Sequence, residues 1–178
     1  KIPKQKCAIK NGVQMLQPYK GSFDTDWYAG TADAVAQNLS FVRNGQPEYV
    51  LILSGDHIYE MDYDMLVRFH REKGAKATIC TIRVPMDEAN RFGIMDVDDD
   101  FRVTDFLEKP DNPPGNLANM GVYLFDYDVL EEALQIDQAD PNSSKDFGKD
   151  IIPRMLENND SVYAYPYGGY WIDVGTVD

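Results

Sequence analysis

The chain has 178 residues, of which 43% are hydrophobic and 26% charged, a composition typical of a globular domain rather than of a disordered tail or a fibre. Its 17 basic and 30 acidic side chains give a formal net charge of −13. This charge argues against nucleic-acid binding, because no basic excess is available to neutralise phosphates. No run of about 18 apolar residues occurs, so we expect no membrane-spanning helix.

The first half of the chain alternates between helix-like and strand-like apolar patterns, which predicts an α/β fold. The spacing predicts a helix over 30–45. The near-continuous apolar run at 49–53 is typical of a buried parallel strand, shielded on both faces. Asp62 can cap a second helix that ends near Gly74, and 75–84 is a further strand rich in β-branched residues.

The second half predicts a run of strands and then helices, with no linker, so we expect one domain over 1–178. Asp146 can cap a helix that Pro153 should kink or shorten, and the acidic run 98–100 reads as a hairpin turn. The predicted strands are 92–97, 101–108, 118–126 and 161–167, and the predicted helices are 129–134 and 146–158.

Two aspartates could hold a metal ion. Asp56 follows the predicted strand 49–53 at the edge where ligands bind in open α/β sheets, and Asp173 lies between an aromatic pair and a glycine. Each carboxylate could bind Mg²⁺ against a phosphate, or could instead cap a turn. The histidines give no ligand pair, so we interpret His57 as structural and His70 as a surface residue.

Other segments could contact a nucleotide or a phosphate. Gly30 precedes a helix that Thr31 can cap, so free backbone N–H groups would be presented there, beside the flat ring of Tyr28. Glu108 and Lys109 end a strand, where a lysine can neutralise a phosphate and a glutamate can accept from sugar hydroxyls. Each pattern is also compatible with an ordinary cap or an exposed charge pair.

Taken in order, these segments resemble the bacterial glucose-1-phosphate adenylyltransferases, also called ADP-glucose pyrophosphorylases. The resemblance extends from about Val13 to the last residue. It rests on WYAGTADAV, LSGDHIYEMDY, RFGIMDVD, FLEKP, LANMGVYLF, DFGKDIIP and YWIDVGT.

The resemblance implies a reaction and a fold. The family joins ATP and glucose 1-phosphate into ADP-glucose and pyrophosphate, for glycogen synthesis. The implied fold is a Rossmann-like nucleotidyltransferase domain with a mixed, mostly parallel central sheet, followed in whole enzymes by a left-handed β-helix and assembled as homotetramers. The two cysteines lack zinc and CxxC spacings, in keeping with a reduced, cytoplasmic protein.

The resemblance also assigns roles to individual residues. Asp56 and Asp173 would be the catalytic carboxylates and would hold Mg²⁺. The nucleotide side would contain Gly30 and Thr31. The remaining substrate-binding positions would be Tyr28, Gly93, Glu108, Lys109 and Asn119.

Several departures accompany the resemblance. The family's glycine-rich G-G-x-G-T-R-L loop is missing, so the chain resembles an internal piece of a longer protein, inactive by itself. Ala29, Glu60 and Ile172 stand where the family usually has basic residues, and Asn119 replaces a serine. A non-catalytic or regulatory paralogue that binds nucleotide or sugar phosphate is therefore the alternative. Another sugar-1-phosphate nucleotidyltransferase is a third possibility.

Overall fold

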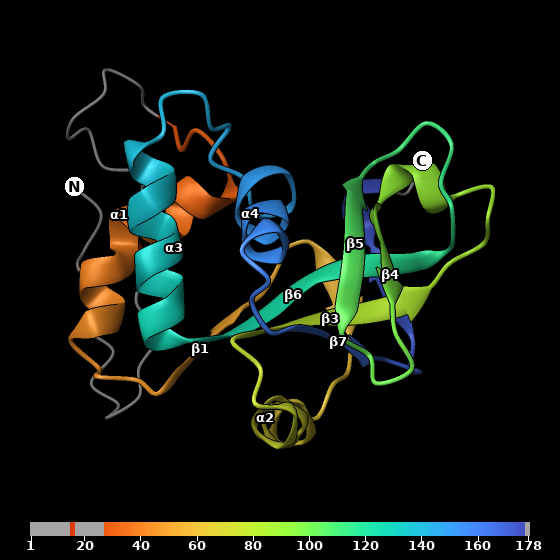
Figure 1. Ribbon diagram of the computed structural model, residues 1–178, viewed down its shortest axis with the longest axis horizontal. Coiled ribbons are helices and arrows are strands. Elements are labelled where there is room, and N and C mark those ends of the chain that lie inside the picture. The colour runs from red at the N-terminus through yellow and green to blue at the C-terminus, as the bar shows by residue number, and fades with distance from the viewer. Residues whose placement is uncertain (1–14, 17–26, 177–178) are drawn as a thin grey trace.

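A computed structural model describes residues 15–16 and 27–176, and its ribbon is drawn in Figure 1. The helices are α1 (Thr31–Arg43), α2 (Tyr63–Lys73), α3 (Tyr127–Ala139) and α4 (Ile152–Glu157), with shorter helical turns at Ala89–Arg91, Phe147–Ile151 and Val174–Thr176. The strands are β1 (Tyr49–Ile52), β2 (His57–Tyr59), β3 (Ala77–Arg83), β4 (Gly93–Val97), β5 (Val103–Glu108), β6 (Leu117–Asp126), β7 (Val162–Pro166) and β8 (Trp171–Asp173).

The main sheet has six strands built around β6. The order is β5-β4-β6-β3-β7, and β1 pairs with β6 beside this path. One edge of β6 pairs with β3, while its other edge takes β4 at Ala118 and β1 from Tyr123 to Asp126. A separate two-stranded sheet joins β2 to β8.

The α/β class predicted from the sequence is confirmed, but the expectation of a mostly parallel sheet is wrong for the described residues. Only β3 and β7 pair in parallel, whereas β6 is antiparallel to β1, β3 and β4, and β4 is antiparallel to β5. The strand predicted at 49–53 is also half-buried rather than fully buried. An apolar run predicts a strand, but the direction of its partner and the depth of its burial depend on other segments of the chain.

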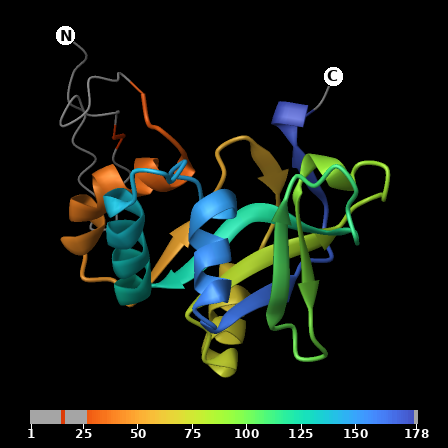
Figure 2. The same cartoon turned by 45° about the horizontal axis from the view of Figure 1, so that its top comes forward.

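Helices cover both faces of the main sheet, as Figures 1 and 2 show. α1, α3 and α4 pack on one face with Tyr123 and Phe125 of β6, whereas α2 packs on the other face with Val122 and Leu124. This alternation is the period of two expected for a strand buried on both faces. Among the described helices, none is both long enough and apolar enough to cross a membrane.

Local capping follows the sequence closely. The Asp62 carboxylate accepts from Asp64 N at 3.0 Å at the start of α2, and Gly74 ends that helix in the left-handed conformation. The Asp146 carboxylate accepts from two backbone N–H groups of the π-helical turn Phe147–Ile151, and Pro153 lies in the first turn of α4. The predicted helix over 146–158 is therefore a π-helical turn that runs directly into the short helix α4, with Pro153 in the first turn of α4, where proline is tolerated.

His70 is buried, not exposed as its charged neighbours suggested. Its side chain is 1% exposed; Nδ1 lies 2.7 Å from Thr78 Oγ1 and Nε2 lies 3.2 Å from Asp126 Oδ1. Burial lowers the pKa of this imidazole, and the Asp126 carboxylate opposes that shift. The charged residues beside His70 in the sequence lie on other faces of α2, which explains the wrong expectation.

Candidate active site

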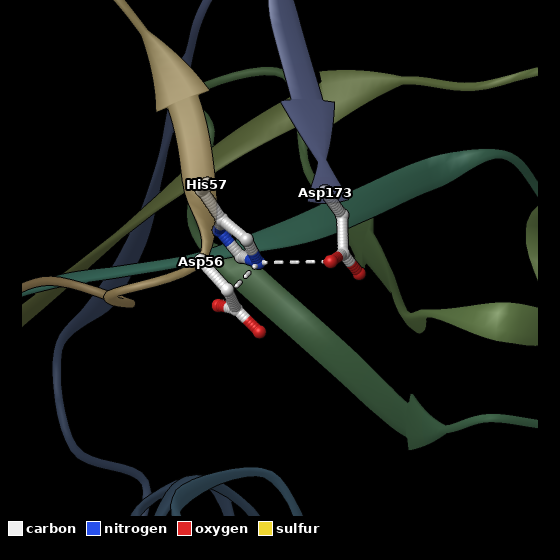
Figure 3. Close-up of side chains that lie close together, drawn as sticks. All are labelled: Asp56, His57 and Asp173. Atoms are coloured by element: carbon white, nitrogen blue, oxygen red, sulfur yellow. Dashed lines mark ion pairs between the residues drawn. The ribbon is translucent and has the colours of Figure 1, made fainter. Parts of the chain in front are cut away.

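The two aspartates singled out in the sequence lie together at one end of the two-stranded sheet (Figure 3). β2 and β8 are antiparallel, and His57 is directly opposite Asp173 in their register. Asp56 immediately precedes β2, and its carbonyl oxygen accepts from Val174 N at 2.9 Å. Pairing of these short strands is what brings together carboxylates that lie far apart along the chain.

His57 lies between the two carboxylates. Its Nε2 atom is 3.6 Å from Asp56 Oδ1 and 3.8 Å from Asp173 Oδ1. The ring packs edge-on against Trp171, with centroids 5.2 Å apart, and rests against Gly121 of β6, where an added Cβ would lie 3.1 Å from His57 Cε1. Sequence reasoning treated His57 as structural, and the structure brings its imidazole to the site.

The residues at this position fit a divalent cation. Asp56, His57 and Asp173 can each turn a ligand atom inward, and these atoms lie within 4.8 Å of one another. The Ser54 hydroxyl donates to Asp56 and lowers the pKa of that carboxyl group below its usual value, so the group is ionised at neutral pH. Magnesium prefers one or two carboxylates together with substrate phosphates and water, and this donor set is compatible with that preference.

The carboxylate of Glu108 occupies a space bounded by two glycines. A Cβ atom added to Gly93 would lie 2.8 Å from Glu108 Oε2, and one added to Gly148 would lie 2.5 Å from it. Burial raises the pKa of Glu108, while the nearby charges of Lys109 and Lys149 oppose this shift. The side chains of Lys109 and Lys149 are exposed, so both can reach an anion bound beside Glu108.

Asn119 lies on β6 between the metal-site residues and the Glu108 region. Its side-chain N–H donates to the Tyr123 hydroxyl at 2.7 Å, and its side-chain oxygen accepts from Gly121 N at 2.9 Å. Tyr123 in turn stacks on Phe147, with ring centroids 5.3 Å apart. Asn119 therefore orders the strand that connects the two parts of the site.

Gly30 and Thr31 are held against the loop that precedes α4. An added Cβ on Gly30 would lie 2.3 Å from Lys145 O, and that same oxygen accepts from Ala32 N at 2.9 Å and from Asp33 N at 3.3 Å. The expectation that free N–H groups are presented at the start of α1 is therefore wrong for Ala32 and Asp33. A protein carbonyl already satisfies these donors.

Side-chain bonds reinforce this contact. The Thr31 hydroxyl donates to Asp146 Oδ2 at 2.9 Å and accepts from Phe147 N at 3.1 Å, so it does not act as the predicted helix cap. Tyr28 OH accepts from Asn38 Nδ2 at 2.9 Å. These bonds connect the proposed nucleotide side to the Asp146 segment beside Glu108.

Comparison with known proteins gives the family. A model described as nucleotidyl transferase matches residues 3–178. The chain belongs to the nucleotidyl transferase family. This match confirms the nucleotidyltransferase domain expected from the sequence.

Several curated relatives that match most of this chain share one name. Glucose-1-phosphate adenylyltransferase of Clostridium perfringens (strain SM101 / Type A) is 52% identical over 167 residues, which cover 94% of this chain and 43% of the relative. The protein of the same name from Clostridioides difficile (strain 630) is 53% identical over 170 residues, covering 95% and 44%. That of Bacillus cereus (strain Q1) is 50% identical over 169 residues, covering 95% and 45%. The chain thus spans less than half the length of these relatives.

Several residues of this candidate site are not apparent from the sequence. No second histidine lies near His57 in the sequence to indicate a ligand pair, yet its ring lies between the two aspartates. Gly148 and Lys149 adjoin Glu108, but DFGKDIIP predicts a capped helix and supports the resemblance without giving either residue a role. The close approach of Gly93 and Gly148 to one carboxylate depends on a contact between separate segments, which spacing alone does not reveal.

Proposed function

We propose that this chain is part of an enzyme that transfers the adenylyl group of ATP to glucose 1-phosphate, and that it contains the residues that bind the sugar phosphate. The products are ADP-glucose and pyrophosphate. The observation that supports this most is the convergence of Asp56 and Asp173, on a nucleotidyl transferase chain that also holds Glu108 between two glycines. The similarity to proteins named glucose-1-phosphate adenylyltransferase supports the choice of substrates.

Glu108 and Lys109 would bind glucose 1-phosphate. The Lys109 ammonium would pair with the phosphate, and the Glu108 carboxylate would accept hydrogen bonds from sugar hydroxyls. Gly93 and Gly148 would leave room for the Glu108 carboxylate. Asn119 would act on this pocket by ordering β6 and the Tyr123 hydroxyl.

The nucleotide would lie toward Tyr28, Gly30 and Thr31. The ring of Tyr28 offers a flat surface beside the start of α1. The contacts of Gly30 and Thr31 with residues 144–147 would fix the distance between the nucleotide and the sugar phosphate. Their contribution in this proposal is positional.

The chemical step would be a direct displacement. A phosphate oxygen of glucose 1-phosphate would attack the α-phosphorus of ATP, forming a new P–O bond. The bond from the α-phosphorus to the bridging oxygen would break, and pyrophosphate would leave with that electron pair. Asp56 and Asp173 would hold Mg²⁺, which when bound neutralises phosphate charge. Lys109 would hold the attacking phosphate in line, so no side-chain nucleophile is required.

The same proposal covers the longer protein, its assembly and its role in the cell. Residues 1–178 would form part of one nucleotidyltransferase domain in a longer, cytoplasmic protein that assembles as a homotetramer and supplies glycogen synthesis. Support comes from the sequence resemblance and from the greater length of the relatives. The mass of the longer parent protein by light scattering would measure its oligomeric state.

A pyrophosphate-release assay tests the reaction. The parent protein should form ADP-glucose from ATP and glucose 1-phosphate, with UTP, GTP and dTTP poor substitutes. The 178-residue chain alone should show no measurable turnover, because it lacks the glycine-rich triphosphate loop. Turnover by the short chain comparable with that of the parent, or a parent preference for another nucleotide, would overturn this assignment.

A non-catalytic, regulatory role is the second candidate. Ala29 and Glu60 are exposed and Ile172 is half-buried, and all three stand where the resemblance leads one to expect a positive charge. Loss of positive charge weakens the binding of a polyanionic substrate. A parent protein that binds ATP or glucose 1-phosphate, measured by calorimetry, but forms no ADP-glucose would favour this role.

A further inference from the structure

The small β2–β8 sheet carries both aspartates, and it contains few residues. It pairs His57 with Asp173, Ile58 with Ile172 and Tyr59 with Trp171. Two-stranded sheets of this size have little stability of their own. Contacts from outside the pair must therefore hold the two strands in place.

Tyr167 contacts both strands at the end away from the aspartates. Its hydroxyl lies 2.7 Å from Glu60 O, just after β2, and 3.1 Å from Tyr170 O, just before β8. One hydroxyl hydrogen is thus shared between two carbonyl oxygens, one directly after β2 and the other directly before β8. At the other end, Val174 N donates to Asp56 O at 2.9 Å.

Tyr167 is itself fixed to the main sheet. Its backbone N–H donates to Thr81 O of β3 at 2.8 Å, directly after β7 ends. Its ring meets that of Tyr59 edge-on, with centroids 6.4 Å apart. Gly169 lies so close that an added Cβ would be 2.3 Å from the Tyr167 hydroxyl oxygen. The hydroxyl is held at a defined place relative to the six-stranded sheet.

We propose that Tyr167 is a positioning residue for the metal-binding pair, and that it acts by tying β2 and β8 together and to the main sheet. The inference rests on the proposed function at one point, namely that Asp56 and Asp173 bind a metal ion. Without the shared hydrogen bond, β8 shifts more freely against β2, and Asp173 spends less time at the spacing from Asp56 that a cation requires. Tyr167 touches neither substrate nor metal in this assignment.

Tyr167→Phe in the parent protein is the direct test, because it removes the hydroxyl and keeps the ring. Tyr165→Phe is the matched control: this half-buried tyrosine packs its ring on Phe69, and its hydroxyl has no hydrogen-bond partner in the described part of the chain. Three measurements apply to both variants. The first is the affinity for Mn²⁺, obtained from the electron paramagnetic resonance signal of free Mn²⁺. The second is the rate of amide hydrogen exchange over 56–60 and 170–174. The third is kcat together with the Mg²⁺ concentration that gives a half-maximal rate.

Tyr167→Phe should weaken Mn²⁺ binding and raise the Mg²⁺ requirement roughly three- to tenfold, the range for one ordinary hydrogen bond. Exchange should accelerate in 56–60 and 170–174 while residues 77–83 of β3 stay protected. The KM for glucose 1-phosphate should change less than twofold, and Tyr165→Phe should match wild type throughout. A purely structural tyrosine would lower the melting temperature without changing the Mn²⁺ affinity of the folded protein.

The results separate this inference from the proposed function. Unchanged Mn²⁺ affinity in Tyr167→Phe, or an equal loss in Tyr165→Phe, overturns the positioning role even if the parent makes ADP-glucose. A parent that makes no ADP-glucose, but whose Mn²⁺ affinity and exchange respond to Tyr167→Phe as expected, retains the positioning role and refutes the proposed function. A wild-type parent that binds no Mn²⁺ overturns the positioning role as well.

Discussion

Glu108 and Gly148 approach each other so closely that a Cβ atom on the glycine would lie 2.5 Å from Glu108 Oε2. The atom in the way is the far end of a flexible side chain, so Gly148→Ala should displace the carboxylate rather than unfold the protein. We expect the KM for glucose 1-phosphate in the parent to rise at least about fivefold, the loss of about one hydrogen bond. Gly168→Ala is the control, since an added Cβ there meets nothing within 4 Å. An unchanged KM in Gly148→Ala would show that the Glu108 carboxylate does not contact the sugar.

Gly30 differs from Gly148 because backbone atoms surround it. An added Cβ would lie 2.3 Å from Lys145 O and 2.7 Å from Ser144 O. Gly30→Ala should therefore lower the free energy of unfolding by roughly 1–3 kcal/mol, as overpacking does. Urea denaturation of the parent, with Gly168→Ala as reference, measures this. Wild-type stability combined with a raised KM for ATP would instead assign Gly30 to nucleotide contact alone.

Lys109 is exposed beside the half-buried carboxylate of Glu108, which suits a cation that pairs with an incoming phosphate. In the parent, Lys109→Ala should raise the KM for glucose 1-phosphate roughly tenfold to a hundredfold, the range for a hydrogen bond to a charged group. The KM for ATP should change much less. Lys76→Ala is a control, because Lys76 pairs with Asp160 through an ordinary ion pair. Equal increases for both substrates would indicate a structural lysine.

Asp56 and Asp173 carry the charge that a cation would need. In the parent, Asp56→Asn and Asp173→Asn should each lower kcat at least about a hundredfold and raise the Mg²⁺ requirement, since each removes charge from the centre that stabilises the transition state. Circular dichroism should be unchanged. Asp99→Asn, in the exposed hairpin turn, should behave as wild type. Near-normal kcat at low millimolar magnesium in either site variant would make that aspartate a turn former.

His70 predicts a pH dependence of stability. Burial holds its pKa below the usual value of 6.5 in the folded protein, so the unfolded chain binds the proton more tightly. The free energy of unfolding should be unaffected by this group above about pH 6.5 and should fall as the pH drops below that value, by at most about 1.4 kcal/mol per pH unit. Melting temperatures of the parent between pH 5 and 8 measure the trend. The slope should shrink in His70→Gln and persist in His57→Gln, and equal slopes in wild type and His70→Gln would refute the assignment.

Local sequence determined the elements and many of their ends. The spacing of apolar residues predicted α1 and α2, and Asp62, Gly74 and Asp146 cap or end their helices as expected. These features depend on neighbours within one helical turn, so a single segment contains the information. The aspartates of the site were also recognisable, because each stands beside a glycine or follows an apolar run.

Only the tertiary structure decided how these segments meet. The antiparallel pairing around β6, the place of His57 between Asp56 and Asp173, and the burial of His70 all depend on contacts between distant segments. A strand's side-chain period shows which face is buried, but it does not specify the partner strand or its direction. The same holds for Glu108 and Gly148, whose contact exists only because β5 ends beside the turn that leads into α4.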